Sequence, residues 1–157
     1  MGDNRKGTLM TSRVLVAGTA SDSHTWNLVY LQLLVEERGH EVVNLGACVP
    51  VPLLVDSCRE QRPDLVVLGT VNGHGHLDAL AAIRALRAVP ELAGLPVVVG
   101  GKLGVLGGQG NDTFTRQLLD AGFTAVFGAE EPISRFEALL DTVVTRHRDL
   151  VGAGRAA

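Results

Sequence analysis

Short apolar runs alternate with longer amphipathic segments along most of this chain. The apolar runs have the length of buried parallel strands, and they are Val14–Ala17, Glu41–Leu45, Leu65–Leu68, Val97–Val99 and Ala125–Phe127. The segments between them have helical spacing, and they are Leu28–Arg38, Pro52–Gln61, Leu77–Arg87, Thr113–Ala121 and Ile133–His147. Parallel neighbours need a crossover connection, which a helix provides. The pattern predicts one doubly wound α/β domain of the flavodoxin-like (Rossmann-like) kind, with a five-stranded parallel sheet.

Glycines mark the ends of two of these helical segments. Gly39 and Gly122 each follow a helical pattern, and both fit the left-handed helix stop that glycine enters without steric cost. We expect the domain to span residues 13–147, with a flexible N-terminal tail over residues 1–12 and a flexible, Gly/Ala-rich C-terminal tail over residues 148–157.

Composition excludes several classes of function. The net charge is −3 and the basic residues are scattered, which does not fit a nucleic-acid surface. The first twelve residues lack the apolar core of a signal peptide, and no apolar run has the length of a membrane span. Cys48 and Cys58 have neither metal nor redox spacing. We therefore expect a cytoplasmic protein that binds neither nucleic acid nor membrane.

Three unusual loops follow strands of the predicted sheet. They are Gly18–Asn27 after the first strand, Gly69–His76 after the third and Gly100–Gly110 after the fourth. Ligands of open α/β sheets bind beyond the carboxyl ends of the strands, where these loops would meet. Two of the loops are rich in glycine, which lets backbone approach a ligand closely. The sequence therefore predicts a ligand site at this edge.

The first loop carries the string Asp22-Ser23-His24. In an extended loop, side chains two apart point the same way, so Asp22 can reach one ring nitrogen of His24 and leave the other facing outward. A carboxylate in that position fixes the tautomer and makes the free nitrogen a better metal ligand or base. In the alternative interpretation, Asp22 caps the following helix and His24 is an ordinary exposed residue. Spacing alone leaves both open.

Three segments together resemble a known family. They are "SDSHTWN", "VVLGTVNGHGH" and "VVVGGKLGVLGG", and they are similar to the Asp-x-His-x-x-Gly, Ser-x-Leu and Gly-Gly motifs of cobalamin-binding domains. Within that family the chain most resembles the small subunits of glutamate mutase (methylaspartate mutase), from about Arg13 to Thr145. The resemblance implies a base-off, His-on corrinoid, whose own base leaves cobalt while its nucleotide tail enters a slot in the domain.

The resemblance also assigns residues to the cofactor. His24 would bind cobalt as its axial ligand, Asp22 would be the partner of His24, and no residue of this chain would be catalytic. The full cofactor-binding set is Ser21, Asp22, Ser23, His24, Thr25 and Asn27, then Gly69, Thr70 and Val71, then Gly100, Gly101, Lys102, Leu103, Gly104, Val105 and Leu106.

The chain departs from the motifs at several positions. The motif glycine is Asn27, which we expect to replace it at a positive φ because Asn tolerates that region best. The Ser-x-Leu serine is Gly69 and the leucine is Val71, while Thr70 should face the other side of the sheet. A hydroxyl for a base nitrogen is therefore missing, which costs about 1 kcal/mol.

The resemblance implies the reversible rearrangement of L-glutamate to 3-methylaspartate with adenosylcobalamin, in a heterotetramer with a larger barrel subunit that holds the substrate. Two other interpretations stay open. A corrinoid carrier for methyl transfer usually has an N-terminal helical bundle, whereas only about twelve polar residues precede the first strand here. The second interpretation is a degenerate binding module that has lost the cofactor, because Asn27 and Gly69 depart from the motifs. His74 and His76 form a further His-x-His pair, without a third metal ligand near in sequence.

Overall fold

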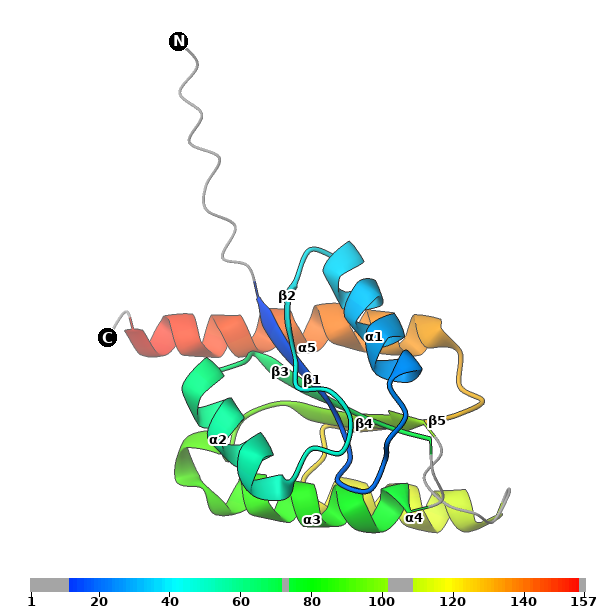
Figure 1. Cartoon of the computed structure of the whole chain (residues 1–157). Coiled ribbons are helices and arrows are strands. Elements are labelled where there is room, and N and C mark those ends of the chain that lie inside the picture. Colours follow the sequence, from blue (N-terminus) through cyan, green and yellow to red (C-terminus); the bar gives the residue numbers. More distant parts are fainter. Residues whose placement is uncertain (1–11, 72–73, 102–108, 156–157) are drawn as a thin grey trace.

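The chain folds as a parallel sheet with helices on both faces (Figure 1). The structure, a computed structural model of the 157-residue chain, describes residues 12–71, 74–101 and 109–155. The elements of these residues are β1 (Arg13–Gly18), α1 (Trp26–Glu37), β2 (Glu41–Asn44), α2 (Val51–Gln61), β3 (Leu65–Thr70), α3 (Gly75–Ala88), the 3₁₀ helix η1 (Pro90–Leu92), β4 (Val97–Gly101), α4 (Gln109–Ala121), β5 (Ala125–Gly128) and α5 (Ile133–Arg155). The sheet order is β2-β1-β3-β4-β5, and all described neighbours pair in parallel. The predicted fold class is confirmed.

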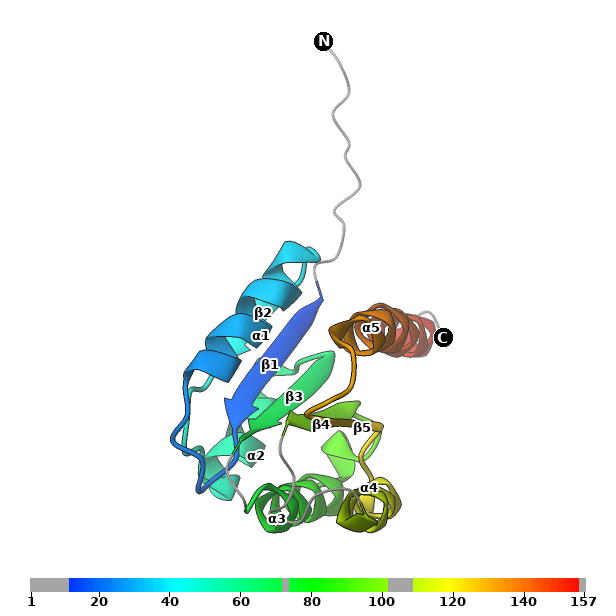
Figure 2. The ribbon, with the colours of Figure 1, turned by 90° about the vertical axis from the view of Figure 1, so that its right-hand side faces the viewer.

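The central strands supply side chains to two separate cores. Every residue of β3 is buried, as expected of a strand that is covered on both faces. Leu68 packs with residues of α2, α3 and α4, whereas Val67 packs with residues of α1 and α5. Figure 2 shows these two groups of helices on opposite faces of the sheet. The alternation of the strands thus decides which helices each side chain meets.

The order of the strands reverses between β1 and β3. From β1 the chain first crosses to β2 on one side, and it then returns to β3 on the other side. Loops that leave two such neighbours diverge and open a crevice beyond the carboxyl ends of the strands. The loops after β1 and β3 therefore flank the expected ligand position.

The first four long helices end within one residue of the predicted positions, whereas α3 and α4 begin earlier than predicted, at Gly75 and Gln109. Gly39 and Gly122 have φ values of +87° and +123°, which confirms both predicted stops. Helix α5 differs, because it continues beyond His147 to Arg155, into residues that the sequence assigned to a tail. A glycine inside a helix costs only about 1 kcal/mol relative to alanine, so a Gly-rich end does not oblige a helix to stop. Within the described residues, no helix has the length and apolar character needed to cross a bilayer.

Arg87 fastens the end of α3 to two neighbouring turns. Its Nε and Nη2 donate to the carbonyl of Gly122 at 3.1 and 2.7 Å, and its Nη1 donates to the carbonyl of Leu92 at 2.8 Å. Partial burial lowers the pKa of Arg87 from its ordinary value. The guanidinium thus donates to the carbonyl that follows α4 and to the last carbonyl of η1, which also accepts the N–H of Leu95.

We expect Arg87→Ala to lower the free energy of unfolding by about 2 kcal/mol, because two carbonyls lose a charged donor. Arg84→Ala is the matched control, since Arg84 is exposed on the same helix, and its effect should stay within about 0.5 kcal/mol. Urea denaturation of the cofactor-free chain measures both. Equal losses in the two variants would contradict this role of Arg87.

Candidate functional site

The loop after β1 is tied to its surroundings by backbone hydrogen bonds. The N–H of Asp22 donates to the carbonyl of Thr19 at 3.0 Å, and the carbonyl of Asp22 accepts the N–H of Cys48 at 2.9 Å. Cys48 has a φ of +51°, a conformation that is uncommon outside glycine. The bond to Asp22 therefore helps to hold the loop after β2 in a strained turn against the loop after β1.

The carboxylate of Asp22 joins this loop to the end of β3. Its Oδ1 accepts the backbone N–H of His24 at 3.0 Å and lies 2.7 Å from Nδ1 of the same residue. Its Oδ2 accepts the N–H of Val71 at 2.5 Å. Asp22 is only 1% exposed, so its carboxylate is shielded from solvent. The alternative role of Asp22 as a helix cap is not seen, because Thr25 is the N-cap of α1 and no side chain caps it.

His24 presents one ring nitrogen outward. Its side chain is 59% exposed although its partner carboxylate is buried. Oδ1 of Asp22 accepts a hydrogen bond from Nδ1 of His24. The neutral imidazole therefore carries its proton on Nδ1 and keeps a lone pair on Nε2. No described residue forms a hydrogen bond to Nε2. The predicted geometry is confirmed, and it leaves a nitrogen that can bind a metal ion from outside the protein.

Three other polar residues of this loop, Ser21, Ser23 and Thr25, lie at its surface. Ser21 donates from both its N–H and its hydroxyl to Asp78 in the first turn of α3. Ser23 and Thr25 are exposed. The three residues therefore lie around the Asp22–His24 pair, as the sequence predicted, and Ser21 links the loop to α3.

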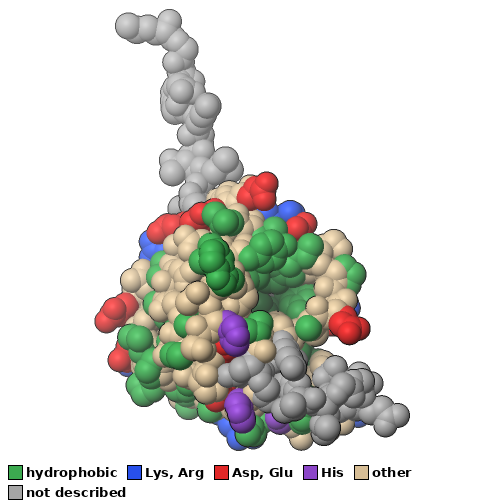
Figure 3. Space-filling view, turned by 45° about the vertical axis from the view of Figure 1, so that its right-hand side comes forward, with side chains coloured by type: hydrophobic (Ala, Val, Ile, Leu, Met, Phe, Trp, Pro, Cys, Tyr) green, Lys and Arg blue, Asp and Glu red, His purple; other side chains and the backbone are tan. Residues whose placement is uncertain are grey.

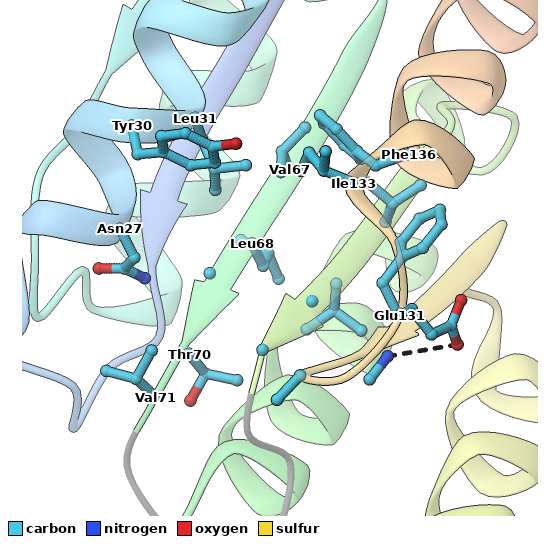
Figure 4. Close-up of a pocket in the computed structure, with 18 of the residues that line it drawn as sticks. Asn27, Tyr30, Leu31, Val67, Leu68, Thr70, Val71, Glu131, Ile133 and Phe136 are labelled. Atoms are coloured by element: carbon cyan, nitrogen blue, oxygen red, sulfur yellow. Dashed lines mark hydrogen bonds between the residues drawn. The ribbon is translucent and has the colours of Figure 1, made fainter.

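A cavity of about 450 Å³ lies between α1 and α5 above the sheet. We call it the α1–α5 slot. Figure 4 shows Asn27, Tyr30 and Leu31 of α1 on one side, Ile133 and Phe136 of α5 on the other, and β3 between them. In Figure 3 the hollow has hydrophobic side chains in its walls, with histidine side chains on the same face. Its described lining also includes Val67, Leu68, Gly69, Thr70, Val71, Val98, Val99, Gly100, Gly101, Phe127, Gly128, Ala129, Glu131 and Pro132.

Arg38 ties the C-terminal end of α1 to α5. Its Nε donates to Oδ1 of Asp141 at 3.2 Å, its Nη2 pairs with Oδ2 of the same carboxylate, and its Nη1 lies 3.3 Å from Glu137. The hydrogen bond from Arg38 holds the pKa of Asp141 below its usual range. The two helices are thus joined beyond their first turns, whereas their N-terminal turns line the slot.

A row of glycines crosses the sheet and reaches the floor of the slot. Gly18, Gly69 and Gly100 are paired partners on β1, β3 and β4. Gly69 and Gly100 line the slot, whereas Gly18 lies against Ala47 in the loop after β2. Gly101 follows with a φ of +114°, and a Cβ there would lie 1.8 Å from the carbonyl oxygen of Thr70. Only glycine fits that position. The row leaves backbone accessible to a ligand in the slot.

One prediction about the motif glycine is wrong. Asn27 has no positive φ, because it lies in the first turn of α1, a helix that begins at Trp26. The helix starts two positions earlier than its apolar pattern indicated, so the backbone at residue 27 is ordinary helix. The side chain of Asn27 lines the slot beside Gly69.

The predicted residues of the three loops reach the same edge of the sheet where the structure describes them. Gly69, Thr70, Val71, Gly100 and Gly101 all line the slot. Thr70 has the strand parity of Leu68, whose side chain belongs to the core on the far face, as expected. The predicted Lys102, Leu103, Gly104, Val105 and Leu106 lie outside the described residues.

Sequence reasoning missed the walls of the slot. Tyr30, Leu31, Ile133 and Phe136 come from helices whose apolar spacing is typical of core positions. The available signal was an excess of apolar residues on α1, where Tyr30 remains 53% exposed in the structure.

The His-x-His pair has no metal site around it in the described residues. No group of three His, Cys, Asp or Glu side chains there could hold an ion. The ring of His76 instead stacks on Phe114, with centroids 4.1 Å apart. His24 is thus a better candidate metal ligand than His74 or His76. A single histidine can bind a metal ion whose other ligands belong to a cofactor.

A profile of the B12 binding domain family matches residues 12–139, and the chain belongs to this family. It is a cobalamin-binding domain. The glutamate mutase sigma subunit of Halobacterium salinarum is 31% identical over 136 residues, which cover 86% of this chain and 87% of the relative. The glutamate mutase sigma subunit of Fusobacterium nucleatum is 25% identical over 129 residues, covering 82% of this chain and 92% of the relative.

Among solved structures, a cobalamin-binding protein from Desulfitobacterium hafniense superimposes with a TM-score of 0.62 and 24% identity. The match covers 75% of this chain and 53% of that chain. At this identity the likeness concerns the fold.

We expect Asp22→Asn to lower the free energy of unfolding of the cofactor-free chain by about 2 kcal/mol. The amide keeps one acceptor oxygen, so its NH₂ group must face either the Val71 N–H or the N–H groups of His24. Asp56→Asn is the control, because Asp56 is exposed on α2. If urea denaturation gave the same midpoint for both variants, the carboxylate would not hold the site together.

Proposed function

We propose that this chain is the small, cobalamin-binding subunit of an adenosylcobalamin-dependent carbon-skeleton mutase, most closely of glutamate mutase, which interconverts L-glutamate and 3-methylaspartate. The observation that carries the proposal is the exposed Nε2 of His24, backed by the buried Asp22 and set beside the α1–α5 slot. The two relatives named glutamate mutase sigma subunit, which align over most of their length, support the mutase role.

The residues of the site fit a corrinoid that is bound base-off and His-on. His24 offers a single nitrogen, which suits a metal already held by an equatorial ring. The slot is apolar and has the volume of a small-molecule site. Gly69, Gly100 and Gly101 leave room where a nucleotide tail would pass the strand ends. We assign His24 to cobalt and the slot to the tail.

A bound adenosylcobalamin would supply radical chemistry. The residues of this chain would bind the cofactor and orient it. Asp22 keeps the proton of His24 on Nδ1, so that Nε2 stays a ligand and His24 does not act in proton transfer. The walls Leu31, Val67 and Phe136 offer apolar surface to the nucleotide tail.

A separate larger barrel subunit would hold the substrate, with the corrin between the two chains, in a heterotetramer. Trp26 follows His24 by two residues and is 84% exposed, which supports a covering partner on this side of α1. Cys48 and Cys58 are both free thiols, in keeping with a reducing cytoplasm.

We expect the purified chain to retain hydroxocobalamin through desalting, with the visible spectrum of a histidine-ligated, base-off corrinoid. His24→Ala should weaken binding by more than the 10- to 100-fold that is usual for loss of a ligand's supporting group, and any residual complex should show the base-on spectrum. His74→Ala is the control, because His74 lies at the same edge of the sheet and outside the proposed cobalt site. Retention of the histidine-ligated spectrum in His24→Ala would refute the assignment.

The mutase role needs its own assay. The loaded chain is mixed with the large subunit of glutamate mutase, adenosylcobalamin and L-glutamate, and 3-methylaspartate is measured. Cobalamin retention without product would favour a corrinoid carrier, and failure to retain cobalamin even with the large subunit present would favour a degenerate module.

A further inference from the structure

The side chain of Asn27 lies against Gly69 and leaves no room for a side chain at residue 69. Gly69 lies on β3 and Asn27 in the first turn of α1. A Cβ added to Gly69 would lie 2.9 Å from Nδ2 of Asn27 and 3.2 Å from Cδ2 of Leu28. The first distance is too short for an ordinary contact, so the carboxamide of Asn27 occupies the space that a side chain at residue 69 would need.

The carboxamide of Asn27 lacks protein partners in the described part of the chain. Its Oδ1 is buried without a hydrogen bond, and no described residue accepts from its Nδ2. Figure 4 shows the nitrogen end turned from α1 toward β3, into the slot. The buried, unpaired atom is the acceptor Oδ1, which faces away from the slot. The donor Nδ2 faces the slot and can donate a hydrogen bond to an acceptor inside it.

The lining of the slot indicates the kind of group. Its described residues include no Lys or Arg, and its one carboxylate, Glu131, is paired with Arg135. The walls from Leu31, Val67 and Phe136 are apolar. Such a slot fits a neutral, planar heterocycle better than a phosphate, and the Nδ2–H of Asn27 is a donor for a single ring nitrogen.

We infer that Asn27 is a specificity-determining residue that donates a hydrogen bond from α1 to the heterocyclic lower base of the corrinoid. It thereby replaces the side-chain hydroxyl that residue 69 cannot supply from β3. The inference deepens the proposed function and rests on the slot as the site of the nucleotide tail. Asn27 in place of the motif glycine thus compensates for Gly69 in place of the motif serine. The affinity of the chain for a corrinoid would then depend on the lower base.

A mutant cycle with two corrinoids tests this inference. The variants are Asn27→Ala, Gly69→Ser and the double variant, and the probes are hydroxocobalamin and cobinamide, which lacks the nucleotide tail. Quenching of Trp26, the single tryptophan, gives the dissociation constants. Asn27→Ala should weaken cobalamin binding about 3- to 10-fold. Gly69→Ser should weaken it at least as much, because the new side chain meets Asn27.

The double variant should recover to within about twofold of the wild-type affinity for cobalamin, because one hydrogen bond replaces the other. Cobinamide binding should stay within about twofold in Asn27→Ala and in the double variant, which also shows that both are folded. Unchanged cobalamin binding in Asn27→Ala, an equal loss for cobinamide, or additive losses in the double variant would each overturn the inference.

The cycle also separates this inference from the proposed function. A wild-type chain that retains neither corrinoid would refute both. A wild-type chain that binds cobalamin and cobinamide equally well through His24 would leave the cobalt ligand in place and overturn only the role of Asn27.

Discussion

The buried carboxylate of Asp22 is the contact on which the arrangement of the site depends. It accepts from His24 in the loop after β1 and from Val71 at the end of β3, while its backbone holds Cys48 after β2. These segments leave adjacent strands at the point where the strand order reverses, and their natural tendency is to diverge. One side chain therefore both closes the loops together and determines which nitrogen of His24 remains free.

The α1–α5 slot depends on a different constraint, which is the absence of side chains. Gly69 and Gly100 are paired on β3 and β4 in the floor of the slot, and Gly101 lies against the carbonyl of Thr70 where no Cβ fits. The helices above are joined beyond their first turns by Arg38 and its carboxylate partners. An open floor between two tethered helices gives the domain a deep apolar slot beside a single exposed ligand nitrogen.

The sequence predicts the sheet and the Asp22–His24 contact because both follow from local pattern: apolar alternation in one case, two-residue spacing in the other. The walls of the slot could not be predicted in this way. Tyr30 and Phe136 have the spacing of core residues, and only the tertiary packing leaves a gap between them. Asn27 and Gly69 are far apart in the chain, so the sequence gives no sign that the side chain of Asn27 occupies the space beside Gly69 in the structure.

The most direct test of this account is the electron paramagnetic resonance spectrum of the chain loaded with cob(II)alamin after growth on nitrogen-15 histidine. The unpaired electron couples to the nitrogen that is bonded to cobalt, and the heavy isotope turns each triplet of lines into a doublet. We expect doublets in the labelled protein and triplets in the unlabelled protein. Triplets in both would mean that the base of the cofactor itself is still bound to cobalt, and that His24 is not the ligand.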